Sequence, residues 1–432
     1  MSDRTHEPAR LNRLSGDHIP SLQSLRGIAS LTVLLRHYVR CFPGGETFWL
    51  TFQNIFFNSQ AAVVVFFVLS GFVLSPSFFN KSINVRELAG FYVRRFFRIV
   101  PLLAVVTALS FFYVKSAFST WKVPFANSWF DGLLAHDVPL SASILVKCFV
   151  GMNSALVPQN WTIACELLVA LILPFLVKAC TGRLWLAVLT FIIATALSFI
   201  AADGGGKSLP VVYAVDFVVG ILTFRILQSH DNRYSDLFFY AAVIGLVGAR
   251  NMLEVLTGQV DLPFNDPLLS LVEAIFAAVI IYGLATKNHM SRLLSVRWLV
   301  WLGDISFGIY LVHFLVIVIV ARLMTSFLLP YSLLVQAFLM LVPVLAVSLA
   351  AAYFAFRFIE IPFNDLGKSL QRRVRTAFSR GRLIEIRHLL LPSEGGEDVV
   401  FSSVRERAWS RAWVRAHNPD GILASAAQLL CG

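Results

Sequence analysis

Ten long apolar runs divide the sequence, and each is close to the length of a helix that crosses a membrane. Such a helix needs about 20 mostly apolar residues to span roughly 30 Å of hydrocarbon. Runs of this kind lie near 25–43, 60–79, 97–118, 159–179, 184–201, 209–228, 236–254, 267–286, 299–325 and 332–358. They predict an all-α integral membrane protein with about ten transmembrane helices. The run at 236–254 could instead be re-entrant, because Arg250, Asn251 and Glu254 crowd its end.

The composition favours a membrane protein over a soluble one. Hydrophobic residues make up 57% of the 432-residue chain and charged residues only 14%. A soluble domain typically has about 45–50% apolar and about 25% charged residues. The five cysteines are widely scattered, with no spacing typical of metal ligands, so we expect free thiols or core residues and no metal site.

The net charge of +11 would also suit nucleic-acid binding, but the basic residues stand in short groups between the apolar runs, so we expect no nucleic-acid partner. With ten spans and an inner N-terminus, the inner segments hold Arg4, Arg10, Arg13, Lys81, Arg86, Arg94, Arg95, Lys178, Arg183, Arg233, Lys287, Arg292, Arg297 and the basic tail. The outer segments hold little beyond Lys122, Lys147 and Lys207. Because positive charge marks cytoplasmic loops, this asymmetry predicts that both termini are cytoplasmic.

Three segments follow from this layout: a cytoplasmic N-terminal segment at 1–21, a transmembrane domain at 22–362 and a basic cytoplasmic tail at 363–432. The tail carries the run Arg-Arg-Val-Arg at 372–375 and further arginines among Trp409 and Trp413. It is either a partly disordered segment held at the anionic inner leaflet by its charge or a partner-binding amphipathic helix.

Arg26 and His37 form the sharpest pair of polar residues within a predicted span. A charged residue at the centre of a span costs about 2.5–3.5 kcal/mol, so each one is a candidate for function. The two residues are eleven positions apart, which places them on one helix face, roughly 16 Å apart along the axis. Arg26 could grip an anion and His37 could exchange a proton. Alternatively, Arg26 reaches the lipid headgroups and His37 is a hydrogen-bonded core residue.

Other polar residues extend the list of candidates. Arg95 and Arg98 are three residues apart in the loop expected after the second span, where they could form a fork for phosphate or an ordinary positive anchor. Ser70 and Gly71 would permit close helix packing or leave room for a ligand chain. Glu166, five residues after Trp161, needs a buried partner such as histidine or arginine. Ser306, Tyr310 and His313 can line one stripe of the ninth span. His313 alone would be structural, but together these residues imply a polar pathway or a catalytic chamber.

These residues resemble the acyltransferase-3 family of integral membrane O-acyltransferases, which modify bacterial cell-surface glycans. The resemblance lies in six motifs in family order, covering roughly residues 22–362: Leu25–Ala29 with His37 and Tyr38, Phe66–Phe72, Arg95–Pro101, Trp161–Glu166 with Pro174, Ile305–His313 and Glu360–Pro362. It implies a multi-pass protein of the bacterial cytoplasmic (inner) membrane that transfers an acyl group, most often acetyl, from cytoplasmic acyl-CoA to a hydroxyl of a surface or lipid-linked saccharide.

The resemblance also implies residue roles. Arg95 and Arg98 would hold CoA phosphate, and Arg26 would position the donor. His37 would act as general base or carry the acyl group, and Glu166 would orient its imidazole. Ser70, Gly71, Trp161, Ser306, Tyr310 and His313 would support the site, without a metal. The rival interpretations are a proton-coupled transporter or flippase that uses the buried histidine and glutamate as a relay, and a non-catalytic scaffold or sensor.

Overall fold

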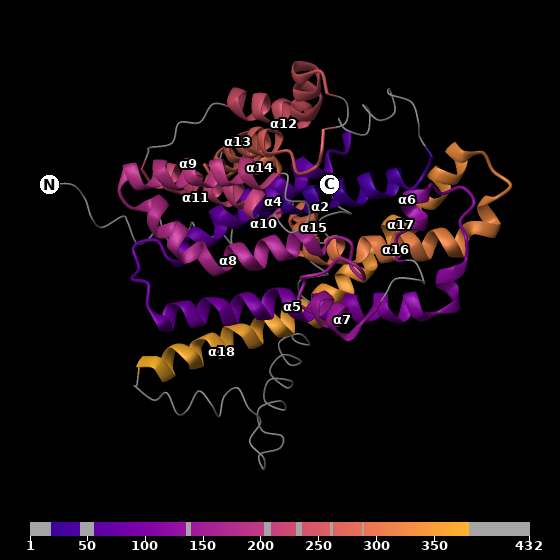
Figure 1. Ribbon diagram of the computed structural model, residues 1–432, viewed down its shortest axis with the longest axis horizontal. Coiled ribbons are helices and arrows are strands. Elements are labelled where there is room, and N and C mark those ends of the chain that lie inside the picture. Colours follow the sequence, from indigo (N-terminus) through magenta and orange to yellow (C-terminus); the bar gives the residue numbers. More distant parts are fainter. Residues whose placement is uncertain are drawn as a thin grey trace, which may run out of the picture. The chain divides into compact units, whose positions relative to one another are not determined.

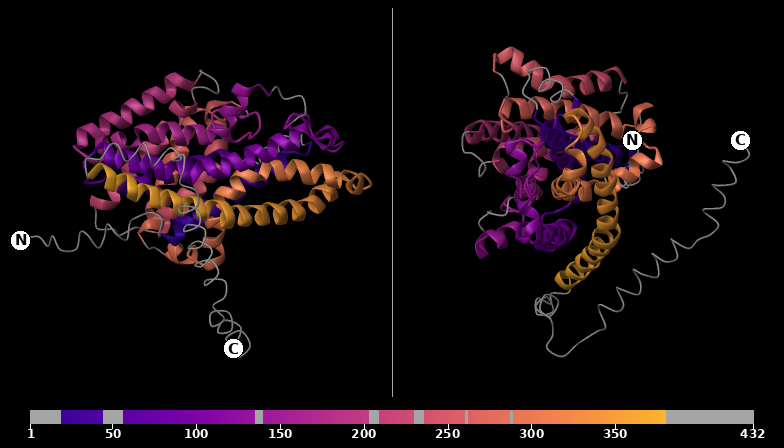
Figure 2. Two further views of the ribbon diagram at one scale, coloured as in Figure 1. Left: turned by 90° about the horizontal axis from the view of Figure 1, so that it is seen from below. Right: turned by 90° about the vertical axis from the view of Figure 1, so that its right-hand side faces the viewer.

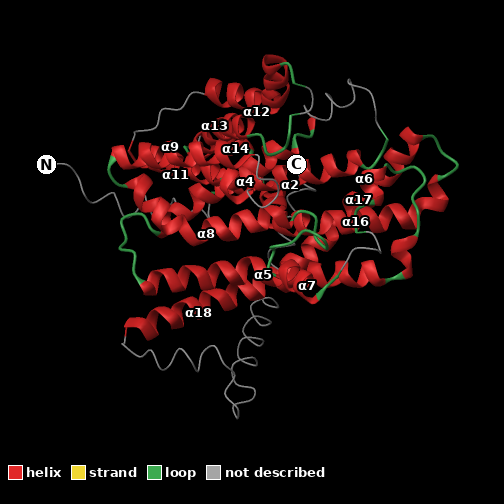
Figure 3. Ribbon diagram, in the orientation of Figure 1, coloured by secondary structure: helices red, strands yellow, loops and turns green. Residues whose placement is uncertain are grey.

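The structure is a computed structural model that describes residues 19–43, 56–134, 140–202, 209–229, 236–259, 262–286 and 289–379. All regular secondary structure in these residues is helical (Figure 3), which confirms the predicted all-α class. The chain forms two compact units, one from 1–84 and 99–359 and the other from 85–98 and 360–432. The predicted N-terminal segment, apart from its last residues, and the tail beyond residue 379 lie outside the described residues.

Each predicted span is helical, although those at 209–228 and 299–325 are each divided between two α-helices. The long helices are α2 (Pro20–Arg40), α4 (Ser59–Leu74), α5 (Val85–Lys115), α8 (Asn160–Thr181), α9 (Leu184–Ala201), α11 (Ala214–Ser229), α12 (Asp236–Thr257), α13 (Pro267–Ala285), α16 (Ser306–Leu328) and α17 (Leu333–Ala355). The short ones are η2 (Ser75–Ser77), η3 (Ala117–Thr120), α6 (Ser128–Asp131), α7 (Ala142–Phe149), α10 (Leu209–Val212), α14 (His289–Leu293) and α15 (Arg297–Asp304). After α17 come the π-helix η5 (Phe356–Glu360) and α18 (Ile361–Ser379).

Within the described chain, 9 helical segments are long and apolar enough to cross a membrane. The remaining predicted span is α2, whose arginines and His37 make it more polar than the other long helices. A polar helix can lie in a membrane when its polar side chains face other helices rather than lipid. The packing of α2, described below, meets that condition.

Three boundaries differ from the sequence predictions. The stretch around Arg95, predicted as a loop, is the first part of α5, which continues through Gly90 and Pro101 to Lys115. The run at 236–254 is one continuous helix up to Thr257, so the re-entrant alternative is wrong. The predicted span at 299–325 is broken at Ile305, where α15 ends and α16 begins.

Close helix packing places α2 within the first unit. Helix α2 packs against α4, α15 and α16, and α4 packs in turn against α11 and α13. Gly71 permits the approach of α4 to α11, since a Cβ at this position would overlap the carbonyl oxygen of Phe217. Gly303 does the same between α15 and α2, where a Cβ would overlap the carbonyl oxygen of Gln23. Helices α16 and α17 form an antiparallel pair, coloured orange in Figures 1 and 2.

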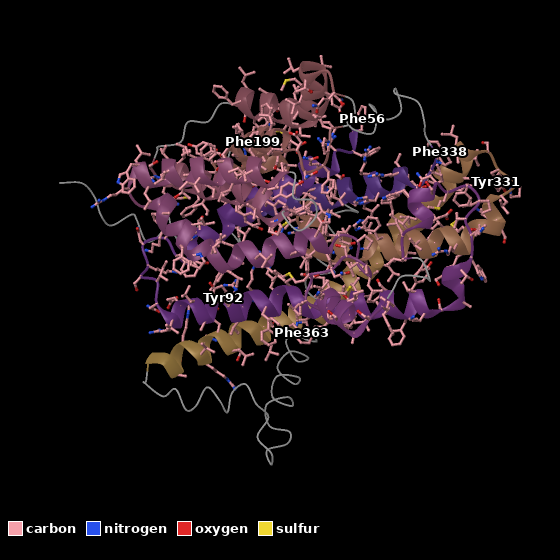
Figure 4. The ribbon with its side chains drawn as sticks, viewed as in Figure 1. Phe56, Tyr92, Phe199, Tyr331, Phe338 and Phe363 are labelled. Atoms are coloured by element: carbon pink, nitrogen blue, oxygen red, sulfur yellow. The ribbon has the colours of Figure 1, made fainter. Side chains whose placement is uncertain are left out.

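Several helices of the first unit present large apolar side chains outward. Only 11% of the 18-residue apolar stretch of α9 is buried, and Phe199 on this helix is 47% exposed. Phe338 on α17 is 65% exposed, and Figure 4 labels both side chains. Apolar exposure on this scale marks a surface that contacts lipid rather than water.

In the second unit, the first part of α5 pairs with α18. The carboxylate of Glu87 accepts a hydrogen bond from Arg375 at 2.6 Å, and the rings of Phe97 and Phe363 stack with centroids 6.4 Å apart. Since early residues of α5 meet late residues of α18 and the reverse, the two segments are antiparallel. Of the tail, this helix is the part that the structure describes.

Candidate active site

Two histidines from helices far apart in the sequence meet inside the first unit. His37 on α2 and His313 on α16 are 276 residues apart, yet Nδ1 of His37 lies 3.1 Å from Nε2 of His313. Their rings are nearly parallel, with an interplanar angle of 15°. Phe314 covers both, with its ring centroid 4.4 Å from that of His37 and 4.6 Å from that of His313. His313 is fully buried and His37 is partly exposed.

The surrounding hydrogen bonds assign the proton positions on this pair. Nδ1 of His313 lies 2.7 Å from the carbonyl oxygen of Tyr310 and 3.2 Å from that of Ile309. A carbonyl oxygen can only accept, so this nitrogen carries the proton and Nε2 of neutral His313 is an acceptor. Nδ1 of His37 must therefore donate to it. The lone pair of neutral His37 is then on Nε2, the nitrogen available to take a proton or to attack a carbonyl carbon.

The N-terminal end of α8 holds α16 in place near His313. The side-chain amide of Gln159 donates to the carbonyl oxygens of Tyr310 and Leu311, at 2.9 and 2.7 Å. The hydroxyls of Thr162 and Tyr310 are 2.8 Å apart. These bonds tie α16 at the residue whose carbonyl oxygen holds the proton of His313. Tyr310 and His313 lie three residues apart on α16.

Glu166 has a partner on α4. Its Oε1 accepts a hydrogen bond of 2.6 Å from the hydroxyl of Ser70. This is a short bond, as expected when the acceptor is charged. The contact joins two residues that the sequence singles out separately. The side chain that the structure places against Nδ1 of His37 is that of His313.

Arg26 lies on α2 near α15. Its Nη1 is 3.5 Å from Oε1 of Gln23, at the limit of a hydrogen bond. Asp304, at the end of α15 and outside the helices long enough to span the membrane, also faces Arg26 electrostatically. Burial raises the pKa of Asp304 above its ordinary value, and the positive charge of Arg26 lowers it in part. Arg26 therefore has one amide oxygen at 3.5 Å and the electrostatic influence of one carboxyl group.

Arg95 and Arg98 belong to the second unit, on the first part of α5. Both are partly buried and, three residues apart on a helix, they share a face, whereas Arg94 is exposed. Their helical setting gives the pair the fixed spacing that a phosphate fork needs.

The remaining predicted residues, Gly71, Trp161 and Ser306, lie in packed parts of the first unit. The backbone of α11 occupies the space beside Gly71. Of the two predictions for Ser70 and Gly71, this is the close packing of helices. The ring of Trp161 packs against Tyr213 and Phe264, with centroid distances of 5.5 and 5.6 Å. Ser306 is 1% exposed, and its hydroxyl has no hydrogen-bond partner among the described residues. Among the residues that the structure describes, no three His, Cys, Asp or Glu side chains are grouped so that they could hold a metal ion.

Trp129 and Arg40 lie beside His37 and were not predicted as site residues. The ring of Trp129, on α6, is nearly parallel to that of His37, with centroids 6.1 Å apart and an angle of 16°. Arg40 places its guanidinium carbon 4.8 Å from the centre of the Trp129 ring. The position of Arg40 three residues after His37 was an available signal, because that spacing shares a helix face. Trp129 carries no such signal, since it comes from a distant connecting segment.

The chain belongs to the acyltransferase-3 family, whose profile, described as an acyltransferase domain, matches residues 19–353. The matched part includes the histidine pair, Glu166 and the arginines of α2 and α5. The protein is therefore a membrane-embedded acyltransferase with several spanning helices.

Two curated proteins are similar to the chain. Acyltransferase MdmB of Streptomyces mycarofaciens is 29% identical over 347 residues, which are 73% of this chain and 82% of that protein. Peptidoglycan O-acetyltransferase OatA of Listeria monocytogenes serovar 1/2a (strain ATCC BAA-679 / EGD-e) is 24% identical over 399 residues, 83% of this chain and 58% of OatA. No solved structure matches the chain significantly.

Proposed function

We propose that this acyltransferase moves an acyl group, in the first instance acetyl, from cytoplasmic acyl-CoA to a hydroxyl of a cell-surface or lipid-linked saccharide at the bacterial inner membrane. The observation that carries the proposal is the His37–His313 hydrogen bond, which leaves the lone pair of His37 on Nε2. A histidine held in one tautomer by its Nδ1 proton is the arrangement of the base in a catalytic triad. Here a neutral imidazole stands in place of the usual carboxylate.

The reaction needs one proton acceptor and one proton donor at the same place. Nε2 of His37 takes the proton of the acceptor hydroxyl while its oxygen attacks the thioester carbonyl carbon. The carbon–sulfur bond breaks, and the imidazolium returns the proton to the CoA thiolate. Alternatively, Nε2 attacks the thioester first, the CoA thiolate leaves, and the imidazole carries the acyl group until the hydroxyl attacks it and passes its proton to the thiolate. Both routes use the same nitrogen and give the same ester and free CoA.

Arginines supply the donor site in this proposal. The Arg95 and Arg98 pair holds CoA phosphate, because guanidinium groups bind phosphate in a bidentate way. Arg26 positions the donor along α2. The amide oxygen of Gln23 and the carboxyl group of Asp304 compete with the donor for the guanidinium of Arg26, so donor binding there exchanges one set of oxygen acceptors for another.

The central experiment follows release of CoA thiol from acetyl-CoA by the purified protein in detergent, with envelope glycan from a strain lacking the gene as acceptor. His37→Ala should stop release and ester formation, whereas His289→Ala, an exposed histidine on α14, should keep both. Comparing the glycan mass of the deletion strain with that of its parent identifies the acyl group. Unchanged surface acylation in cells that carry His37→Ala would contradict the proposal.

The donor site has its own test. Arg95→Ala combined with Arg98→Ala should weaken acetyl-CoA binding about tenfold or more, since two charge-assisted contacts are lost. The matched control is Arg292→Ala with Arg297→Ala, which removes the same charge from the end of α14 and the start of α15. Acetyl-CoA binding is measured by titration calorimetry at the same protein concentration for both double variants. Equal affinities would show that Arg95 and Arg98 act only as positive anchors that set the topology.

A further inference from the structure

We propose that Trp129 and Arg40 form the subsite that holds a sugar ring of the acceptor beside His37. This inference rests on the proposed function and adds two residues that bind the acceptor. The geometry that leads to it is the stack of His37, Trp129 and Arg40 at the C-terminal end of α2.

Trp129 is held in place by the end of α2. The backbone N–H of Asn127 donates to the carbonyl oxygen of Cys41 at 3.0 Å, and its side-chain amide donates to that of Arg40 at 2.6 Å. The side-chain oxygen of Asn127 caps α6 by accepting from the N–H of Phe130 at 3.0 Å. Phe130 is fully buried and anchors the short helix. These contacts fix the indole within reach of whatever reacts at His37.

The chemistry of the pair suits a saccharide. The face of an aromatic ring carries negative charge density and attracts the weakly positive C–H groups on the apolar face of a sugar. The guanidinium of Arg40 offers several donors to the hydroxyl or carboxylate oxygens around the same ring. Arg40 is exposed, so its guanidinium can leave the indole and bind these oxygens while the sugar packs on the ring. Binding sites of this type combine an aromatic wall with a few placed polar groups.

The position separates the acceptor from the donor. Arg40 and Trp129 lie at the C-terminal end of α2, whereas Arg26, assigned to the donor, lies in its N-terminal half, eleven residues before His37. Acceptor and donor then approach His37 from opposite ends of one helix. The subsite places the acceptor hydroxyl near Nε2 of His37 and has no part in binding CoA.

The test measures KM for donor and acceptor separately in proteoliposomes, with acetyl-CoA and envelope glycan from the deletion strain. Trp129→Leu should raise KM for the glycan about tenfold and leave KM for acetyl-CoA unchanged, whereas Trp129→Phe, which keeps an aromatic face, should stay within about threefold of wild type. Trp185→Leu, at an exposed tryptophan of α9, is the matched control and should change neither constant. Arg40→Ala combined with Trp129→Leu should raise KM for the glycan by less than the product of the two single increases, because both residues hold the same sugar ring.

Several outcomes would overturn the inference. A raised KM for acetyl-CoA would assign Trp129 to the donor, and a lower kcat with unchanged KM would make it a support for His37. Equal loss with Trp129→Leu and Trp129→Phe would indicate a packing role. A wild type that transfers nothing to the glycan refutes the proposed function itself, whereas an active wild type with an indistinguishable Trp129→Leu variant refutes only the subsite.

Discussion

In the proposed mechanism, His37 is prepared for reaction by a neutral neighbour, His313. A carboxylate beside His37 would bring a second charge into a region of low dielectric, which is costly unless it is fully compensated. Neutral His313 accepts the hydrogen bond from Nδ1 of His37. The Nδ1 proton of His313 is held in turn by the carbonyl oxygen of Tyr310. This series of hydrogen bonds ends at a backbone carbonyl oxygen, which can only accept. Both hydrogen bonds therefore have a fixed donor and a fixed acceptor.

At the level of this pair, we expect His313→Ala to lower kcat about 100-fold with little change in either KM, because the loss of the acceptor frees the other tautomer of His37. His313→Gln should recover part of the rate, since its side-chain oxygen can accept the Nδ1 proton. Initial rates over a range of both substrates separate kcat from KM. Equal rates for the Ala and Gln variants would show that His313 acts only by packing.

Individual helices approach one another where side chains are small. Gly71 and Gly220 stand on facing sides of α4 and α11, and a Cβ on either would overlap a backbone carbonyl oxygen of the other helix. Ser70 is next to this contact and donates to Glu166 on α8. The close approach of α4 to α11 thus helps to set the position of the serine that binds the partly buried carboxylate of Glu166.

For these helices we predict that Gly71→Ala destabilises the protein by about 1–3 kcal/mol, the usual effect of forcing extra volume into a packed interior. Thermal unfolding of the detergent-purified protein measures it as a lower Tm. Gly248→Ala is the matched control, because nothing lies within 4 Å of a Cβ at that position of α12. It should keep or slightly raise the Tm, since alanine is the better helix former. If the two variants unfold alike, the packing contact is not limiting.

In the proposed reaction, the whole molecule takes its donor from one side of the membrane and its acceptor from the other. The basic segments follow the predicted inner side, from Lys81 before α5 and Arg86 at its start to the arginines of α18. Exposed apolar side chains on α9 and α17 give the first unit a surface suited to lipid. If α2 crosses between these sides as its position in the sequence predicts, His37 on this helix can serve both substrates of the proposed reaction.

The predicted orientation can be measured with single cysteines at exposed lysines. Lys122→Cys should react with a membrane-impermeant maleimide on intact cells, whereas Lys81→Cys should react only after permeabilisation. The background is low because Cys41, Cys148, Cys165 and Cys180 are buried, and Cys431 can be replaced by serine. The reverse labelling pattern would overturn the assignment of both termini to the cytoplasm.

The sequence by itself determined the elements of this protein. Apolar length and charge placement are local properties, so they predict the long helices closely: the run at 184–201 is α9 without change. Errors arose where local signals conflict. Basic residues around Arg95 resembled a loop although no residue there breaks a helix, and polar residues at the end of α12 suggested a re-entrant segment although they are compatible with a continuous helix.

Only the tertiary structure decided which buried polar groups meet. Periodicity places His37, Glu166 and His313 on helix faces, but it says nothing about how each helix is rotated toward its neighbours. A hydrogen bond forms over about 3 Å, far less than the width of a helix face. The pairing of His37 with His313, of Glu166 with Ser70, and the placement of Trp129 beside the imidazole depend on rigid contacts between segments distant in the sequence. Packing of whole helices sets those distances, and no single stretch of sequence contains them.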